Sequence, residues 1–185
     1  KQHGWTVTGI TISTAEEQVA SAWCDRVVLA DLEQGLPSSC GQYDVVLLSH
    51  VLEHLANPSR LLADARQAIN SSGVIAVALP NVLHWAQRLQ FLFGRFEYTE
   101  AGILDDTHLR FYTPATAREL LLRHRYKIVM ELVDGSFPMP KIRRVIPQAI
   151  AASIDRIACR LRPGLFGYQM FYLARPSQTA PAPRT

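Results

Sequence analysis

Several side chains that can bind a ligand or carry a proton come directly after apolar runs of this sequence. Asp31 follows the run 26–30, and His50 follows the run 43–49. A carboxylate at Asp31 can accept a hydrogen bond from an exocyclic amine, and the neighbouring backbone N–H can meet a ring nitrogen. Those two contacts suit an adenine. The simpler interpretation is that Asp31 caps a turn or a helix.

The five residues His50-Val51-Leu52-Glu53-His54 also fit the HxxEH pattern of inverted zinc peptidases. In that pattern two histidines one helical turn apart hold a metal beside a catalytic glutamate. It requires a helix here and a distant third ligand, whereas this block sits at the end of a buried strand. We therefore expect no metal site, and we expect His54 to hydrogen-bond a loop and Glu53 to face solvent or a helix cap.

These side chains need an open sheet to position them. Runs rich in β-branched or aliphatic residues predict strands at 5–12, 26–30, 43–49, 74–79, 126–133 and 168–174. The unbroken aliphatic run 45–48 is typical of a parallel strand covered on both faces. Strands that alternate with helices predict an α/β fold with an open sheet, helices on both faces and a ligand at the carboxyl ends of the strands.

Capping residues and apolar spacing predict the helices. Helices are expected to begin near Ser13, Asn57 and Thr113, and another to cover 82–93. The first has a stripe of Ala15, Val19, Ala22 and Trp23, the second one of Leu61, Leu62, Ala65 and Ile69, and a late helix one of Ile150, Ile154, Ile157 and Leu161. We interpret 94–112, which lacks periodicity, as a loop or lid.

Composition limits the class of protein. The 185 residues predict one domain over 1–176 and a flexible tail over 177–185. A net charge of +3 does not indicate a nucleic-acid partner, and the longest aliphatic run, 74–79, is too short to span a membrane. Three cysteines without CxxC spacing favour a reducing, cytoplasmic location. Because the chain opens on Lys1 without a leader, we expect further sequence upstream.

The block 43–55, YDVVLLSHVLEHL, resembles the motif that closes the fourth strand in class I S-adenosylmethionine-dependent methyltransferases. Asp31-Leu32-Glu33 with Leu36-Pro37 is similar to a second motif of that family, and the similarity extends over 4–175. The segment 94–113 resembles a subgroup found beside sugar-polymer biosynthesis enzymes. The resemblance implies a Rossmann-like sheet, mostly parallel with the last strand antiparallel, and S-adenosyl-L-methionine as cofactor.

The same resemblance assigns cofactor contacts. Asp31 and Leu32 are assigned to the adenine, and Ser49 and His50 to the methionine part of the cofactor. Family members usually hold both ribose hydroxyls with an acidic residue after the second strand. This chain has Thr11 and Ile12 there, a form similar to the cyclopropane fatty acid synthase branch, and Thr11 is expected to make one of those bonds.

A larger departure is the first strand with its glycine-rich loop, the main cofactor cradle of the family, which the sequence does not contain. In the family's strand order it lies between the second and fourth strands. Its absence would leave two facing strand edges unpaired, at a cost of about 1–3 kcal/mol for each buried backbone group. We expect this segment upstream of Lys1.

Methyl transfer from a sulfonium is a direct displacement, so the protein mainly aligns the reacting atoms and accepts a proton from a hydroxyl nucleophile. Candidate bases are His108, which we favour because imidazole titrates near neutral pH, His84, and the pair Asp105-Asp106. His108 is as well explained as a residue that pins the lid. Candidate acceptor contacts are Asn81, Tyr98 and Arg110.

The predicted function is a cytoplasmic methyltransferase acting, preferably at oxygen, on a small-molecule or a lipid- or carbohydrate-linked acceptor. The alternative is a non-catalytic methyltransferase-like binding or scaffold domain. Six cations and one acid lie within 141–162, so an interfacial helix on anionic lipid is conceivable. We favour instead a helix whose apolar stripe packs on the sheet.

Overall fold

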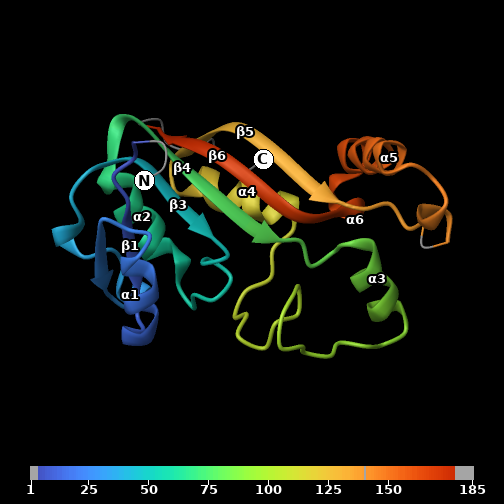
Figure 1. Cartoon of the computed structure of the whole chain (residues 1–185), viewed down its shortest axis with the longest axis horizontal. Helices are drawn as coiled ribbons and strands as arrows, with labels where there is room; N and C mark the ends of the chain where they lie inside the picture. Colours follow the sequence, from blue (N-terminus) through green and yellow to red (C-terminus); the bar gives the residue numbers. More distant parts are fainter. Residues whose placement is uncertain (1–3, 140, 178–185) are drawn as a thin grey trace.

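The computed structural model describes residues 4–139 and 141–177. Within them the strands form two sheets (Figure 1). The smaller sheet pairs β1 (Thr8–Thr11) with β2 (Arg26–Leu29) in parallel. The larger sheet has the order β3-β4-β6-β5, formed by β3 (Tyr43–Ser49), β4 (Ile69–Pro80), β6 (Gly167–Pro176) and β5 (Tyr126–Gly135).

The strand directions confirm the predicted fold class. β3 and β4 run parallel, and β6 runs antiparallel to both β4 and β5. The chain therefore has a mixed α/β fold of the Rossmann-like kind, with the last strand reversed. β4 is longer than predicted, because Ile69 leaves the helix and pairs with Tyr43, ahead of a register shift in β3.

The sheet is interrupted between β1 and β3. Neither edge has a second strand partner among residues 4–139 and 141–177. The space between their amino ends is an open cavity of about 520 Å³, lined by residues 4–6 and 42–45.

Helices begin where capping residues predict them. Ser13 accepts the Glu16 N–H at the start of α1 (Thr14–Ser21), and Asn57 accepts the Ser59 N–H at the start of α2 (Pro58–Ala68). Thr113 and Thr116 form a reciprocal capping box at α4 (Pro114–Arg123). The other helices are α3 (Trp85–Leu92), α5 (Gln148–Leu161) and the short α6 (Pro163–Phe166).

The core lies between the larger sheet and the helices α2 and α4, which Figure 1 shows behind the strands. Leu61 and Leu121 are fully buried there, facing Tyr172 of β6. Tyr126 is buried at the start of β5, and its hydroxyl donates to the Leu62 carbonyl at 2.9 Å. The predicted apolar stripe of α2 is therefore the face that packs into the core.

Two predicted stripes are not buried, and for the late helix the expectation that its stripe packs on the sheet was wrong. α1 has no buried residue, and Val19 and Trp23 are exposed. In α5 the residues Ile150, Ile157 and Leu161 are exposed, while the helix packs through Ala151, Ala158 and Cys159. The contact face of α5 is therefore offset from its most hydrophobic stripe, because small residues allow the closer approach. No helix among the described residues has the length and apolarity needed to cross a membrane.

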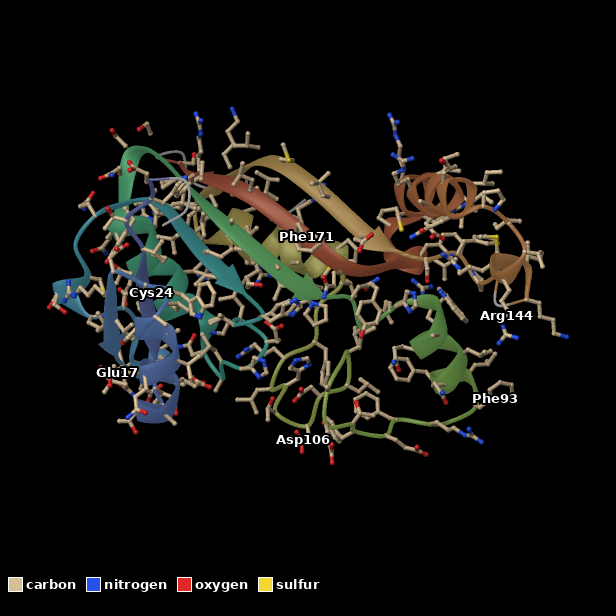
Figure 2. The ribbon with its side chains drawn as sticks, viewed as in Figure 1. Glu17, Cys24, Phe93, Asp106, Arg144 and Phe171 are labelled. Carbon is tan, nitrogen blue, oxygen red and sulfur yellow. The ribbon has the colours of Figure 1, made fainter. Side chains whose placement is uncertain are left out.

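The segment between α3 and α4 is a loop, as its lack of periodicity predicted. Figure 2 shows Asp106 at its far edge, away from the strands. The loop returns to the sheet where the Leu109 and Arg110 N–H groups donate to the Glu53 carbonyl at 2.8 and 3.0 Å. It is thereby held against the turn that follows β3, where the predicted site lies.

Candidate functional site

Loops that follow β2 and β3 meet at one edge of the molecule. The Glu33 carboxyl accepts the backbone N–H of Ala56 at 2.5 Å and that of Asn57 at 3.4 Å. These bonds tie the loop after β2 to the connection between β3 and α2. Asp31 and His50 therefore belong to neighbouring loops, as carboxyl-end positions of parallel strands require.

Asp31 has both a local role and an available oxygen. Its Oδ1 accepts the Glu33 N–H at 2.9 Å and caps the short 3₁₀ helix 32–34, which is the capping role considered from the sequence. The side chain is exposed, so Oδ2 can still meet a ligand. Leu32 packs partly against the core and fixes this turn.

Thr11 stands at the end of β1 beside a carboxyl group that sequence reasoning missed. Its hydroxyl donates to Glu16 Oε2 and accepts the Ser13 N–H at 3.1 Å. Ile12 points outward, 72% exposed. Glu16 therefore brings an acid to the strand end that lacks one in sequence. The only local signal was the spacing between Ser13 and Glu16, which indicated a helix start.

His50 has a left-handed backbone conformation, with φ at 52°. Such a conformation is uncommon for a residue other than glycine and persists where surrounding contacts hold it. His50 Nδ1 donates to Glu53 Oε1 at 3.0 Å, and Gln169 Nε2 lies 3.3 Å from His50 Nε2. The ring is thus fixed between the turn after β3 and the strand β6, while the neighbouring Ser49 is exposed.

Glu53 is fully buried, so the expectation that it faces solvent or a cap was wrong. Its Oε2 has no hydrogen-bond partner in the part of the chain that the structure describes. An unsatisfied buried polar atom costs about 1–3 kcal/mol. No helix forms between His50 and Asn57, so the pair of histidines one helical turn apart that the HxxEH pattern requires is not made.

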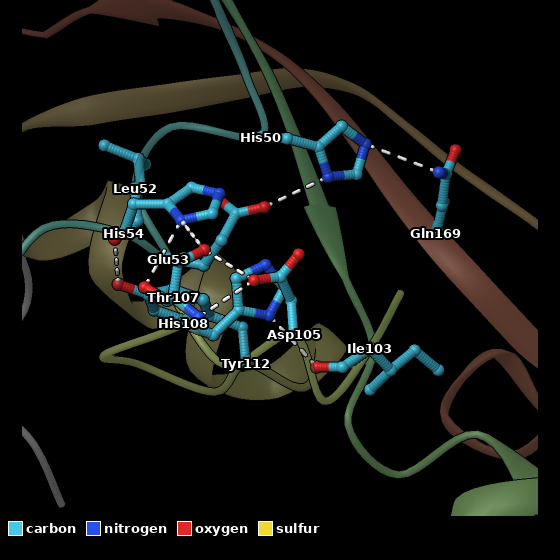
Figure 3. A network of polar contacts seen from close by, with 10 residues as sticks. All are labelled: His50, Leu52, Glu53, His54, Ile103, Asp105, Thr107, His108, Tyr112 and Gln169. Atoms are coloured by element: carbon cyan, nitrogen blue, oxygen red, sulfur yellow. Dashed lines mark hydrogen bonds and ion pairs between the residues drawn. The ribbon is translucent and has the colours of Figure 1, made fainter. Parts of the chain in front are cut away.

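His54 and His108 lie beside Glu53 with their rings in an edge contact, 4.7 Å between centroids (Figure 3). His54 Nδ1 lies 3.0 Å from Thr107 Oγ1 and 3.3 Å from the Thr107 carbonyl, which confirms the expected bond to a loop. His108 Nδ1 lies 3.0 Å from the Ile103 carbonyl, and the side chain is 7% exposed. The structure therefore brings one predicted base, His108, next to the loop after β3.

Asp105 supports this cluster from the outer side. Thr107 Oγ1 donates to Asp105 Oδ1 at 2.5 Å, and the Thr107 N–H donates to the same oxygen at 2.9 Å. These two bonds hold the pKa of the Asp105 carboxyl below its usual range. Asp106, the other acid of the predicted pair, is exposed.

The three predicted acceptor contacts lie in different surroundings. Asn81 is fully buried, and its side chain is occupied by the carbonyls of Gly164 and Gly167. The Arg110 guanidinium donates to the Leu55 and Ala56 carbonyls. Tyr98 is exposed beside Phe96, with an edge contact between the rings. Tyr98 and Arg110 are exposed, whereas Asn81 is not.

His84, the second predicted base, is buried at the start of α3. It lies between the rings of Trp85 and Tyr168, and its Nε2 has no hydrogen-bond partner within 4–139 and 141–177. Burial lowers the pKa of His84. The nearest cation of α3, Arg88, donates to the Leu83 and Gly164 carbonyls and not to the imidazole.

The lowered pKa predicts a pH dependence of stability. In the unfolded chain His84 titrates near its usual value of about 6.5, so as pH falls the unfolded state takes up the proton first. The stabilisation from neutral His84 is complete above pH of about 6.5 and is lost as pH falls toward the lower folded-state value. We expect urea unfolding between pH 8 and pH 5 to show this loss, and the His84→Gln variant to show a smaller slope. If the free energy of unfolding of His84→Gln fell with pH as steeply as that of the unaltered protein, His84 would not be the cause. His124→Gln is the control and should keep the slope of the unaltered protein.

The open sheet, the antiparallel last strand and the polar groups after β1, β2 and β3 define a Rossmann-like α/β domain with a ligand edge. The sequence profile of the methyltransferase domain family matches residues 1–131. The chain therefore belongs to the methyltransferase domain family, and its fold is that of the class I S-adenosylmethionine-dependent enzymes. Among curated proteins, none matches this chain.

Solved structures share this fold at low sequence identity. A SAM-dependent methyltransferase from Archaeoglobus fulgidus is 17% identical with a TM-score of 0.55, over 90% of this chain and 74% of that protein. The O-methyltransferase from the trans-AT PKS multienzyme of Brevibacillus brevis, in complex with S-adenosyl-L-homocysteine, is 18% identical with a TM-score of 0.54, over 93% and 59%. The magnesium protoporphyrin IX methyltransferase of Synechocystis PCC 6803, with bound SAH, is 16% identical with a TM-score of 0.54, over 95% and 66%.

Proposed function

We propose that this chain binds S-adenosyl-L-methionine at the carboxyl ends of β1, β2 and β3 and transfers its methyl group to an oxygen of a small-molecule or lipid- or carbohydrate-linked acceptor. The observation that carries the proposal is that polar groups follow the carboxyl ends of all three strands: Thr11 paired with Glu16 of α1, Asp31, and His50, with Glu33 tying the loop after β2 to the connection after β3. Family membership supplies the reaction class.

Each of these groups suits one part of the cofactor. The Glu16 carboxyl, already paired with the Thr11 hydroxyl, is suited to accept hydrogen bonds from the ribose hydroxyls. Asp31 Oδ2 is suited to the adenine amine, with Leu32 against the ring. His50 and Ser49 then lie toward the methionine part, where the fixed His50 ring limits the positions open to the sulfonium.

The acceptor side requires a group that receives or stabilises the proton of a hydroxyl nucleophile. We assign this task to the cluster of Glu53, His54 and His108. Glu53 and His54 lie in the turn that follows His50, and His108 lies beside them. His84 is a second candidate because its Nε2 is unpartnered. The chemistry itself is a displacement in which the acceptor oxygen takes the methyl carbon and the sulfur keeps the bonding electron pair.

Calorimetry with S-adenosylhomocysteine on the full-length protein tests the proposal. Binding at one site per chain is expected, and the absence of binding would favour the alternative, a non-catalytic scaffold domain. A methyl acceptor is then sought among hydroxyl compounds with labelled cofactor, which separates O-methylation from transfer to another atom.

Variants of the strand-end acids are expected to weaken that binding. Asp31→Ala and Glu16→Gln each remove a hydrogen bond to a charged group, worth about 1.5–3 kcal/mol, so the Kd for S-adenosylhomocysteine should rise about 10- to 100-fold. Glu17→Gln, on the next position of α1, is the matched control and should leave the Kd unchanged. A Glu16→Gln protein with unaltered Kd would show that Thr11 holds the ribose without the acid.

A further inference from the structure

We propose that Glu53, His54 and His108 form a binding site for a divalent metal ion of the zinc class. One ligand atom from each residue lies within 4.8 Å of the other two. Ligands at about 2.1 Å from a tetrahedral ion lie about 3.4 Å apart. The distances between the three ligand atoms therefore need to shorten by at most about 1.4 Å for the side chains to hold an ion.

The buried carboxyl group is the first argument for this site. Glu53 is fully buried and its Oε2 has no partner among the described residues, although Oε1 is held by His50. A buried carboxyl oxygen without a partner is rare in folded proteins and points to an unfilled ligand position. A cation at Oε2 would supply the missing partner.

The histidine tautomers are the second and independent argument. His108 Nδ1 faces the Ile103 carbonyl, and His54 Nδ1 faces the carbonyl and hydroxyl oxygens of Thr107. Since a carbonyl only accepts, each Nδ1 carries the ring proton and each neutral ring presents a free electron pair at Nε2. A metal-binding histidine almost always donates its other ring N–H to a carbonyl, carboxylate or water in this way.

Outer contacts hold the ligands in place, as in known metal sites. Thr107 Oγ1 contacts His54 Nδ1 and donates in turn to Asp105 Oδ1, so a carboxylate supports the histidine through a hydroxyl (Figure 3). The backbone of the same loop is tied to the Glu53 carbonyl through Leu109 and Arg110. The loop between α3 and α4 therefore places His108 beside Glu53 and His54, which are the two ligands in the turn after β3.

The donor set decides the class of metal. Two imidazoles and one carboxylate suit zinc and similar transition ions, whereas magnesium and calcium prefer oxygen ligands. Three protein ligands leave a fourth position open for water or a substrate oxygen. This step rests on the proposed function: an ion held by Glu53, His54 and His108 would occupy the electron pairs that these groups otherwise offer to a proton, so the ion, and not a free imidazole, would lower the pKa of an acceptor hydroxyl at the open position. The acceptor class is then one that binds a metal through oxygen. This ligand set differs from the HxxEH arrangement, because His50 is engaged with Glu53 and Gln169.

Zinc titration of the full-length, chelator-treated protein by calorimetry, with Co²⁺ absorption as a second readout, tests the site. One ion per chain is expected, with tetrahedral Co²⁺ bands. His108→Gln and Glu53→Gln should weaken zinc binding at least about 100-fold, and Thr107→Val about 10- to 100-fold. His124→Gln, at the C-cap of α4, is the matched control and should bind zinc as the unaltered protein does.

His54→Gln keeps the test valid if the buried variants fail to fold, because His54 is only half-buried. Zinc affinity retained in His54→Gln or His108→Gln, or no stoichiometric zinc in the unaltered protein, would overturn the proposal. Zinc binding without S-adenosylhomocysteine binding would uphold the metal site and reject the proposed function. Binding of S-adenosylhomocysteine by a protein that does not bind zinc would support the proposed function and reject the metal site.

Discussion

Replacing Asn81 with alanine is expected to lower the free energy of unfolding by about 3 kcal/mol. The fully buried side chain donates through Nδ2 to the carbonyls of Gly164 and Gly167, at 3.2 and 2.8 Å, and accepts the Leu83 N–H at 3.1 Å. Alanine fills none of these roles: it leaves the buried Gly167 carbonyl and the part-buried Leu83 N–H short of a partner, each costing about 1–3 kcal/mol, while Arg88 still donates to the Gly164 carbonyl. Urea unfolding at neutral pH measures the difference.

Asn70 provides the control for that experiment. Its side chain donates to Asp44 in exposed surroundings, so Asn70→Ala should change the free energy of unfolding by no more than about 0.5 kcal/mol. An equal effect of both substitutions would contradict the structural role of Asn81. If Asn81 instead acts on the acceptor, Asn81→Ala would leave stability intact and raise the KM.

Local signals explain which elements were predictable. Ser13, Asn57 and Thr113 each cap a helix through a bond to a residue two or three positions later. Such contacts depend only on neighbouring residues, so the sequence alone indicates them. The aliphatic run 45–48 correctly predicted the strand β3, but the expected cover on both faces was wrong: Leu48 is buried, whereas Leu47 is 66% exposed.

The site was less predictable because its contacts join distant segments. Glu53 lies beside His108, and Arg110 from the same loop binds the carbonyl of Leu55. Nothing in the sequence near 51–55 indicates that a loop more than fifty positions away covers this block. The sequence alone therefore predicts that Glu53 faces solvent. The exposed stripe of α5 failed for the same reason: hydrophobic spacing predicts an apolar face, while the shape of the partner surface decides which face is used.

The residue that follows β4, Asn81, thus has a structural task, whereas the turn after β3 holds the groups that we propose for the chemistry. Asn81 fixes β4 to α6 and β6, which also carries Gln169 toward His50. Glu53 leaves a buried oxygen without a partner, a feature that a purely structural residue does not need. Because buried polar groups almost always have a partner, a buried oxygen without one is a candidate position for a ligand.

Gly135→Ala is expected to be the other severely destabilising change, at about 3 kcal/mol. A Cβ on Gly135 would lie 2.0 Å from the Phe166 carbonyl oxygen and 2.6 Å from the Tyr168 nitrogen. Both are backbone atoms of the segment that pairs β5 with β6, so no side chain can turn aside. Overpacking of this kind typically costs about 1–3 kcal/mol, and a rigid backbone places it at the upper end.

Gly164→Ala is the matched control, since the nearest atom to its added Cβ is Arg88 Nη2 at 4.0 Å. It should change the free energy of unfolding by at most about 0.5 kcal/mol. Because Asn81 holds the Gly167 carbonyl in the same junction, Asn81→Ala and Gly135→Ala share one segment. Their combined effect in the double variant should be smaller than the sum, since releasing Gly167 lets the backbone move away from the new methyl group. Strict additivity would show that the two contacts act on separate parts of the fold.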